Sequence, residues 1–211
     1  MRSIKVDWWT KSADAGIIKE KIYLLLQKLF SFNLWHVSPI NFRPYALEII
    51  NFVNNYISLN KNQNADAIIE VGCGLGELIG NITYRKKIGF DVDKNVLKAG
   101  VLLFPKVEFH IGSFQDIKNY NIKCLIMVNF IHEISTENMQ AFVQNLIKYN
   151  KIELFVIDIL CDIEGTEYKY KHDGNKLFGS NYTCIKRSQG FPAASGARRV
   201  IEYWEINNLG R

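Results

Sequence analysis

The chain has 211 residues, of which 48% are hydrophobic, so it can form one domain with a substantial core and an N-terminal extension. Its net charge of +5 is mild and its lysines are scattered, which argues against a nucleic-acid partner on electrostatic grounds. Residues 1–9 lack the apolar stretch of a secretory signal, and no apolar run reaches the length of a membrane span. We therefore expect a cytoplasmic protein with no membrane partner.

Cysteine and histidine spacing gives no sign of a metal centre. No C-x-x-C or H-x-x-x-H motif occurs, which excludes the common zinc patterns and a disulfide framework. We expect no bound metal and reduced thiols. The residues concerned are Cys73, Cys124, Cys161 and Cys184, and His36, His110, His132 and His172.

The first 60 residues predict two helices. Asp14 can cap a helix that runs to about Phe32, whose apolar stripe (Ile18, Ile22, Leu25 and Leu29) is expected to face the core. A break with two prolines follows, and a second helix starts at Pro44 and ends before the polar linker 60–64. In the lead-in, Trp8 and Trp9 either pack on the body or cover a substrate.

The central feature is a short apolar run, Ala67–Val71, followed by Gly72, Gly74 and Gly76. Such a run is typical of a buried parallel strand, and glycines after it allow a sharp turn that a ligand can approach closely. The dinucleotide fingerprint needs glycine at position 77, where this chain has Glu77. The pattern therefore predicts a cradle for a different nucleoside cofactor.

The sequence Glu70-Val-Gly-Cys-Gly-Leu-Gly76 resembles the first motif of the class I S-adenosylmethionine-dependent methyltransferases. This resemblance, over about residues 65–206, implies an α/β fold with a Rossmann-like, doubly wound, seven-stranded sheet. It also implies an N-terminal helical lid (1–60) over a cofactor-binding domain (61–211). The residues implied to hold the methionine end of S-adenosyl-L-methionine are Glu70, Gly72, Cys73, Gly74 and Gly76.

A carboxylate follows at the expected distance. Lys86–Asp91 is predicted as the next strand, and Asp91 lies 21 positions (91 − 70) beyond Glu70, where nucleoside-binding α/β units place an acid for the ribose hydroxyls. A fixed carboxylate suits this role because both hydroxyls are donors. We expect Asp91 and its neighbour Val92 to contact the cofactor.

The loop after the predicted strand Val107–Ile111 is expected at the adenine. Related methyltransferases often have an acid directly after this strand, whereas this chain has Ser113 there and Asp116 three positions later. Ser113, Phe114 or the backbone could serve, and Phe114 could stack on the base or belong to the core.

The strand Lys123–Val128 delivers Asn129, His132 and Glu133 to the same sheet edge as Glu70 and Asp91. The resemblance places the Asn129 backbone near the sulfonium. We expect His132 to act as general base, with Glu133 orienting it or serving as the base itself. The alternative is that His132 only packs against or caps the helix that begins at Ser135 or Thr136.

The remaining chain predicts a fifth strand, Glu153–Asp158, and a terminal antiparallel hairpin formed by 182–187 and 198–206. Asp158 again points at the crevice. Side chains that could line an acceptor pocket are Tyr168, Tyr170, His172 and Asp173 in the long connection, and His36, Arg43 and Tyr45 before the second helix.

The acceptor is the least determined part. Asn129-Phe-Ile-His132 is not the Asn/Asp-Pro-Pro-Tyr motif of amino-directed nucleic-acid enzymes. Cys161 follows the fifth strand, not the fourth, and lacks the preceding proline of cytosine-C5 enzymes, so neither base chemistry is favoured. The lead-in Trp35-His-Val-Ser-Pro39 is similar to enzymes of bacterial surface-sugar or secondary-metabolite pathways. We expect O-methylation of a small-molecule or sugar hydroxyl by a monomer or homodimer. A nucleic-acid methyltransferase and a catalytically silent cofactor-binding module remain alternatives.

Overall fold

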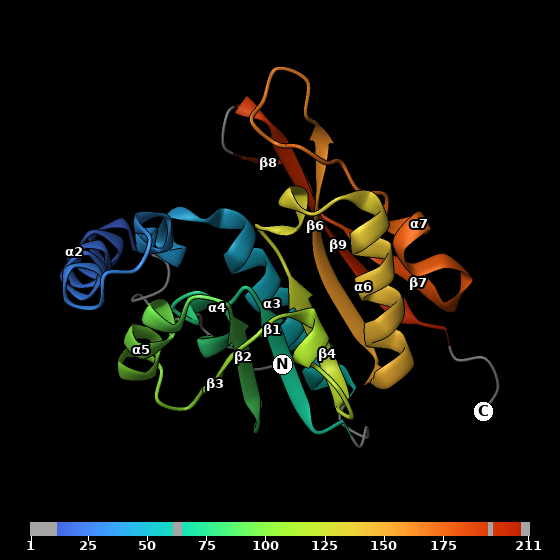
Figure 1. The fold of residues 1–211 in the computed structure, drawn as a ribbon, viewed down its shortest axis with the longest axis horizontal. Helices are drawn as coiled ribbons and strands as arrows, with labels where there is room; N and C mark the ends of the chain where they lie inside the picture. The colour runs from blue at the N-terminus through green and yellow to red at the C-terminus, as the bar shows by residue number, and fades with distance from the viewer. Residues whose placement is uncertain (1–11, 61–64, 194–195, 208–211) are drawn as a thin grey trace.

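The structure is a computed structural model that describes residues 12–60, 65–193 and 196–207. In these ranges one mixed sheet has the strand order β3-β2-β1-β4-β6-β9-β7 (Figure 1). Two short strands, β5 and β8, pair beside β4 and β9. The strands are β1 Ala67–Val71, β2 Lys87–Asp91, β3 Glu108–Ile111, β4 Asn121–Met127, β5 Lys151–Ile152, β6 Leu154–Asp162, β7 Tyr182–Arg187, β8 Phe191–Pro192 and β9 Arg198–Ile206.

The predicted Rossmann-like fold is confirmed. Strands β3, β2, β1, β4 and β6 pair in parallel, and the strand order reverses between β1 and β4. The predicted terminal hairpin pairs as β7 and β9, and β9 runs antiparallel to both β6 and β7. The carboxyl ends of β1, β2 and β4 therefore meet at one sheet edge, as a ligand crevice requires.

The helical segments, in chain order, are α2 Ala13–Phe30, η1 Leu34–Val37, η2 Ile40–Phe42, α3 Pro44–Leu59, α4 Glu77–Gly80, α5 Lys94–Leu103, η3 Phe114–Asp116, η4 Ile131–Glu133, α6 Thr136–Tyr149, α7 Gly174–Phe178 and η5 Gly179–Asn181. None of the helices in the described part of the chain combines the length and the apolar composition needed to cross a bilayer.

Helices cover both faces of the sheet. Neighbouring residues of β1 point to opposite faces, so Ile69 packs in the cluster that contains Val143 of α6, whereas Ile68 packs with Ile50 of α3. Burial on both faces explains the continuous apolar run of β1. Helix α3 thus belongs to the helical layer on one face of the sheet. The boundary at residue 60 between an N-terminal lid and the cofactor-binding domain stays a prediction.

Helix α2 differs from the sequence prediction in two ways. Its N-cap is Ser12, whose side chain accepts from the Ala15 amide, so the predicted cap at Asp14 is wrong by two residues. The helix also packs through a different face, with Ala15, Gly16, Lys19 and Tyr23 buried. The stripe expected to face the core is exposed, at 45% for Ile18, 39% for Ile22, 67% for Leu25 and 69% for Leu29.

Close packing at Gly16 is the physical reason for this orientation. A Cβ on Gly16 would lie 2.8 Å from both Asn41 and Phe42, so η2 approaches α2 where the helix has no side chain. The orientation also turns Lys19 inward, where its charge is paired with Glu77.

Candidate functional site

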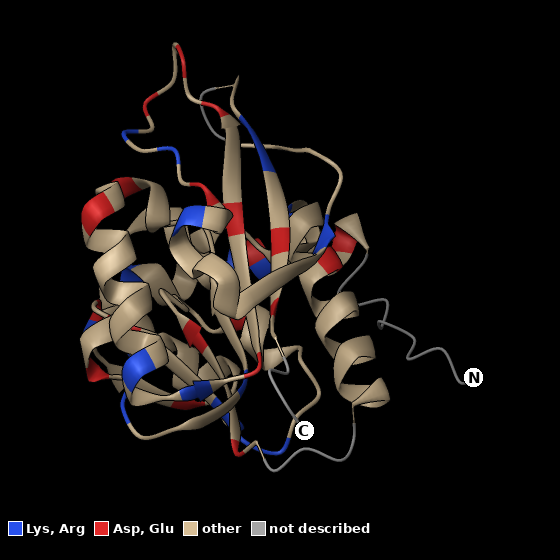
Figure 2. Ribbon diagram, turned by 90° about the vertical axis from the view of Figure 1, so that its right-hand side faces the viewer, with Lys and Arg blue, Asp and Glu red and all other residues tan. Residues whose placement is uncertain are grey.

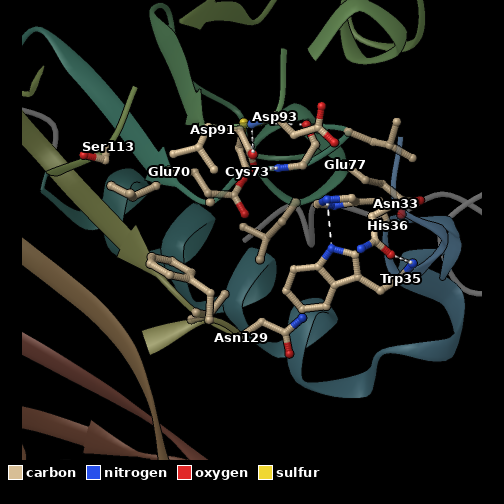
Figure 3. A pocket seen from close by; sticks show the side chains of 18 of the residues that line it. Asn33, Trp35, His36, Glu70, Cys73, Glu77, Asp91, Asp93, Ser113 and Asn129 are labelled. Carbon is tan, nitrogen blue, oxygen red and sulfur yellow. Dashed lines mark hydrogen bonds between the residues drawn. The ribbon is translucent and has the colours of Figure 1, made fainter. Parts of the chain in front are cut away.

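A pocket of about 650 Å³ opens at the carboxyl ends of β1, β2 and β4 (Figure 3). It lies where the strand order reverses, and its volume suits a cofactor with a small acceptor. All the predicted cofactor-binding residues except Gly76 line it, namely Glu70, Gly72, Cys73, Gly74, Asp91, Val92, Ser113, Phe114 and Asn129.

The glycine turn forms one wall of the pocket. Gly74 has a φ of +53°, and a Cβ there would lie 2.6 Å from Nδ1 of His36. Gly76 has a φ of +75°, and a Cβ there would lie 2.5 Å from the Phe109 ring. Both positions therefore need glycine, for the positive φ and for space. Gly76 packs against the Phe109 ring and does not line the pocket.

Asp91 is held in a fixed orientation. Its Oδ2 accepts from the Gly74 amide at 2.8 Å, and its Oδ1 accepts from the Asp93 amide at 2.9 Å. The residue is 6% exposed. Because each carboxylate oxygen can accept more than one hydrogen bond, Asp91 can still receive two hydroxyl donors from the pocket.

Glu70 is buried at the end of β1, where its Oε2 accepts from the Ile79 amide at 3.1 Å. Burial raises the pKa of Glu70 to about 8, and the nearby Asp91 and Glu77 carboxylates act in the same direction, while Arg43 opposes them. Burial therefore favours the protonated carboxyl group more than water does. The short helix α4, of four residues, begins beside it.

The end of the pocket near β3 is apolar and aromatic. Phe114 stacks on Phe142 with ring centroids 5.0 Å apart, while Val92 is 75% exposed at the pocket wall. Asp116, which the sequence left in doubt as an adenine ligand, turns back so that its Oδ2 accepts from the Ser113 amide at 2.8 Å. This orders the Ser113 loop.

The N-terminal segment adds to the pocket wall beside the glycine turn. Trp35 and His36 both line the pocket (Figure 3), and the His36 ring lies against Gly74. The Trp35 indole N–H donates to His36 Nε2 at 2.9 Å, and burial lowers the pKa of His36 against the opposing effect of Asp91. The predicted acceptor candidates His36, Arg43 and Tyr45 all line this pocket, together with Asn33, which the sequence analysis did not single out.

Glu77 joins the N-terminal segment to the glycine turn. Its carboxylate, 2% exposed, accepts from Lys19 Nζ at 3.0 Å, Arg43 Nη2 at 3.0 Å and the Ile40 amide at 2.7 Å. The sequence analysis used Glu77 only to exclude a dinucleotide fingerprint. A charged residue directly after a glycine turn was the available signal, but its partners are too distant in sequence to infer.

His132 does not line the pocket. It is 1% exposed, and its Nε2 lies 3.1 Å from Asp158 Oδ2. Arg199 Nη1 donates to the same oxygen at 2.9 Å and to Asn129 Oδ1 at 2.6 Å, and the Asn129 amide donates to Asp158 Oδ1 at 2.9 Å. Burial alone would raise the pKa of Asp158, but His132 and Arg199 hold it below its usual value.

Asp158 therefore orients His132, a role that the sequence analysis had considered for Glu133. Glu133 is on the surface, where it pairs with Lys169 at 2.6 Å. The predicted general-base role of His132 and the role of Glu133 stay predictions.

The predicted acceptor residues in the long connection lie outside the pocket lining. Tyr168 accepts from Arg199, His172 lies 2.8 Å from the Ile131 carbonyl through its Nε2, and Asp173 caps α7. The Tyr170 amide donates to the His132 carbonyl. Within the described residues, no group of three or more His, Cys, Asp or Glu side chains could hold a metal ion. The predicted positions Trp8 and Trp9 lie outside the described residues.

A scan against protein-family models matched none, and a search of curated proteins found no match. Among solved structures, magnesium protoporphyrin IX methyltransferase (ChlM) from Synechocystis PCC 6803 with bound SAH matches with a TM-score of 0.61 and 11% identity, over 90% of this chain and 99% of that one. The N-methyltransferase NodS from Bradyrhizobium japonicum WM9 in complex with S-adenosyl-L-homocysteine matches with a TM-score of 0.62 and 11% identity, over 88% and 98%.

A putative RNA methyltransferase from Pyrococcus horikoshii matches with a TM-score of 0.55 and 13% identity, over 92% of this chain and 98% of that one. The solved neighbours thus share one fold but have different methyl acceptors. The strand order, the antiparallel β9 and these matches together give the chain the fold of the class I S-adenosylmethionine-dependent methyltransferases.

Proposed function

We propose that this protein is a methyltransferase that uses S-adenosyl-L-methionine. The observation that carries the proposal is the pocket at the strand-order reversal, in which the glycine turn, Glu70 and the fixed Asp91 carboxylate meet. The residues fit the cofactor because Gly72 and Gly74 line the pocket without side chains and Asp91 offers acceptors for a ribose diol. Neighbours of the same fold were solved with S-adenosylmethionine or S-adenosylhomocysteine bound.

Each part of the pocket has a proposed role. Asp91 would bind the ribose hydroxyls, Ser113 and Phe114 would meet the adenine, and Glu70 with the glycine turn would hold the methionine end. The bound cofactor supplies a methyl group on a positively charged sulfur. The chain's task is then to align an acceptor with that methyl group and exclude water.

We propose that the acceptor is a small molecule or a sugar. The methyl group would be transferred to one of its hydroxyl groups. In the part of the chain that the structure describes, Arg43 is the one Lys or Arg side chain of the pocket wall, and it is paired with Glu77. In the view of Figure 2, Lys and Arg are dispersed among Asp and Glu along the ribbon without a continuous basic stripe. A nucleic-acid backbone is usually bound by several cations.

We propose that His132 positions the methyl-transfer site through its neighbours. Asp158 receives the Asn129 amide on one oxygen and His132 on the other, so His132 helps to fix the backbone at the end of β4. A loss of kcat in His132→Ala with the S-adenosylmethionine KM unchanged would instead favour the general-base role predicted from the sequence.

Calorimetric titration of the purified chain with S-adenosylhomocysteine, with NAD in a parallel cell, tests the cofactor assignment. We expect micromolar binding of the first and none of the second. Asp91→Asn should weaken binding by about 1.5 to 3 kcal/mol, roughly 10- to 150-fold, because it removes a charged acceptor. Asp66→Asn is the matched control, since its carboxylate is 62% exposed and pairs with Arg85 outside the pocket.

Three results would contradict the proposal in different ways. NAD binding without S-adenosylhomocysteine binding would place the pocket in another nucleotide class. Cofactor binding without methyl transfer to any hydroxyl, amine or RNA pool would indicate a silent binding module. Salt-sensitive RNA affinity together with RNA methylation would replace the small-molecule acceptor with a nucleic acid.

A further inference from the structure

The outer side of α2 and the turn after it expose an unusual number of large apolar side chains. We call this set the α2 patch. Monomeric proteins rarely expose contiguous apolar patches larger than a few hundred Å², and larger ones mark interaction sites. Figure 1 shows α2 at one end of the molecule, beyond α5 and away from the sheet. The α2 patch consists of Ile17 (47% exposed), Ile18 (45%), Ile22 (39%), Leu24 (39%), Leu25 (67%), Leu29 (69%), Leu34 (61%) and Trp35 (57%).

The centre of the patch is continuous along the helix. Ile18, Ile22, Leu25 and Leu29 follow one another at intervals of four, three and four residues, which places them on one face. The neighbouring face of α2 packs on the body through Ala15, Gly16 and Tyr23. The stripe lies beside this face, and its outer members Leu25 and Leu29 remain 67% and 69% exposed.

Lysines border the stripe. Lys21 and Lys28 are exposed and lie three residues after Ile18 and Leu25, so each is a surface neighbour of the apolar side chains. Helix α5, which packs against α2, exposes Lys94 and Lys98 on its own surface. The exposed acids of α2 are Asp14 and Glu20.

This charge pattern favours one occupant over another. If a second copy of the chain paired along the stripe with antiparallel helices, Lys21 and Lys28 of both copies would line the same flank of the contact and repel each other. An anionic lipid surface avoids this conflict. Lysines beside an apolar face can extend their ammonium groups to lipid phosphates while their stems lie along the apolar boundary.

Trp35 fits the same surface. The residue is 57% exposed, and its indole N–H donates to His36 Nε2. Amphipathic aromatic rings are enriched at membrane–water interfaces. Trp35 also lines the cofactor pocket, so it belongs to both surfaces.

Contrary to the expectation from the sequence that no membrane is a partner, we propose that the α2 patch docks this protein on an anionic lipid bilayer, with α2 lying in the plane of the interface. The apolar stripe enters the boundary between head groups and acyl chains, and Lys21 and Lys28 contact lipid phosphates. Because Trp35 is shared, docking holds the mouth of the pocket beside the bilayer. This inference does not depend on the proposed methyl transfer.

The test is flotation of the full chain with vesicles of phosphatidylcholine alone, or with about one quarter phosphatidylglycerol, since anionic lipids attract surface lysines. We expect binding to the anionic vesicles that weakens with salt. The double variant Leu25→Asp with Leu29→Asp should lose that binding. Leu59→Asp is the matched control, because Leu59 is 75% exposed at the end of α3, outside the patch.

A second variant tests the contribution of the lysines to lipid binding. Lys21→Gln with Lys28→Gln should weaken binding by about fivefold per lysine. Lys118→Gln with Lys148→Gln is the control pair, since both lysines are exposed and distant from α2 in the chain. Titration of each variant with S-adenosylhomocysteine reports whether the pocket is intact, which keeps failure of the lipid proposal separate from failure of the cofactor assignment.

The proposal is overturned if the wild type does not float with anionic vesicles, or if the Leu25 and Leu29 variant floats as well as the wild type. It is also overturned if the wild type is a dimer in solution that this variant converts to a monomer without any vesicle binding. In that case the patch joins two copies of the chain.

Discussion

Replacing Glu77 with glutamine should detach the N-terminal segment from the glycine turn. The substitution keeps the size of the side chain but removes the charge that Lys19 and Arg43 share. Lys19 is then left as a buried cation, 5% exposed, without its carboxylate. Breaking a buried ion pair by changing one partner costs about 3 to 5 kcal/mol. Arg43, at 25% exposure, can recover part of its share through solvent.

Such a loss is large compared with a total stability of about 5 to 15 kcal/mol for a typical domain. We expect it to appear mainly as local opening of residues 12–43, because the sheet keeps its own cores on both faces. Hydrogen exchange should show faster exchange of the α2 amides, and urea unfolding should show an early transition.

Glu108→Gln is the control for this experiment. Its carboxylate is 48% exposed beside Lys86 and His110, so the change should stay within about 0.5 kcal/mol. If α2 exchanges at the same rate in Glu77→Gln and in the wild type, or if the loss is below about 1 kcal/mol, the Glu77 contacts do not hold the segment.

Three further substitutions test the pocket. Gly74→Ala forces a φ of +53° on alanine and places its Cβ 2.6 Å from His36 Nδ1, so S-adenosylhomocysteine affinity should fall by about tenfold or more in calorimetry. Glu70→Gln should flatten the pH dependence of the urea midpoint between pH 4.5 and about 8. Burial raises the pKa of Glu70 to about 8, so the contribution of this residue to stability is full below pH 4.5 and is lost as the pH rises through about 8. Asp158→Asn removes the buried carboxylate beside His132 and should cost about 3 to 5 kcal/mol in urea unfolding.

Each substitution has a matched control. Gly165→Ala has a similar strain, with φ at +72°, but nothing lies within 4 Å of its Cβ, so it should leave cofactor affinity unchanged. Asp162→Asn changes an exposed carboxylate near the end of β6, and Glu108→Gln should retain the wild-type pH profile. If both glycine variants lost the same affinity for S-adenosylhomocysteine, backbone strain, and not the shape of the glycine turn, would explain the loss.

The elements around the cofactor pocket could be predicted because their signals are local. A strand buried on both faces has a continuous apolar run, as in Ala67–Val71, and a turn with positive φ favours glycine, as at Gly72, Gly74 and Gly76. The spacing from Glu70 to Asp91 reflects one strand–helix unit, so Asp91 was also predictable as a pocket residue.

The orientation of α2 could not be predicted by the same reasoning. Periodicity reports that a helix has an apolar stripe, but it does not say whether the protein's own core covers it. Here the face containing Gly16 packs more closely, and the more apolar stripe faces outward. The pairing of Lys19 with Glu77 joins positions 58 residues apart, and no local pattern identifies such a pair.

The orientation of the His132 side chain could not be predicted from the sequence motif. The end of β4 delivers Asn129 to the pocket, but Asn129 adopts a φ of +80° and the short helix η4 then turns His132 toward Asp158. Side-chain direction after such a turn depends on three-dimensional partners, including Arg199 from β9, which lies 70 residues beyond Asn129.

The position of β9 has a consequence for the order in which the sheet can be completed during synthesis. The ribosome makes β6 and β7 before β9, yet in the folded sheet β9 separates them. Until β9 emerges, β6 presents an open edge, β7 has no strand to pair with in the described sheet, and the Asp158 carboxylate lacks Arg199. A nascent chain that stops before residue 198 therefore has an unfinished sheet and an Asp158 carboxylate without its guanidinium partner, and exposed strand edges of this kind are recognised by chaperones and proteases.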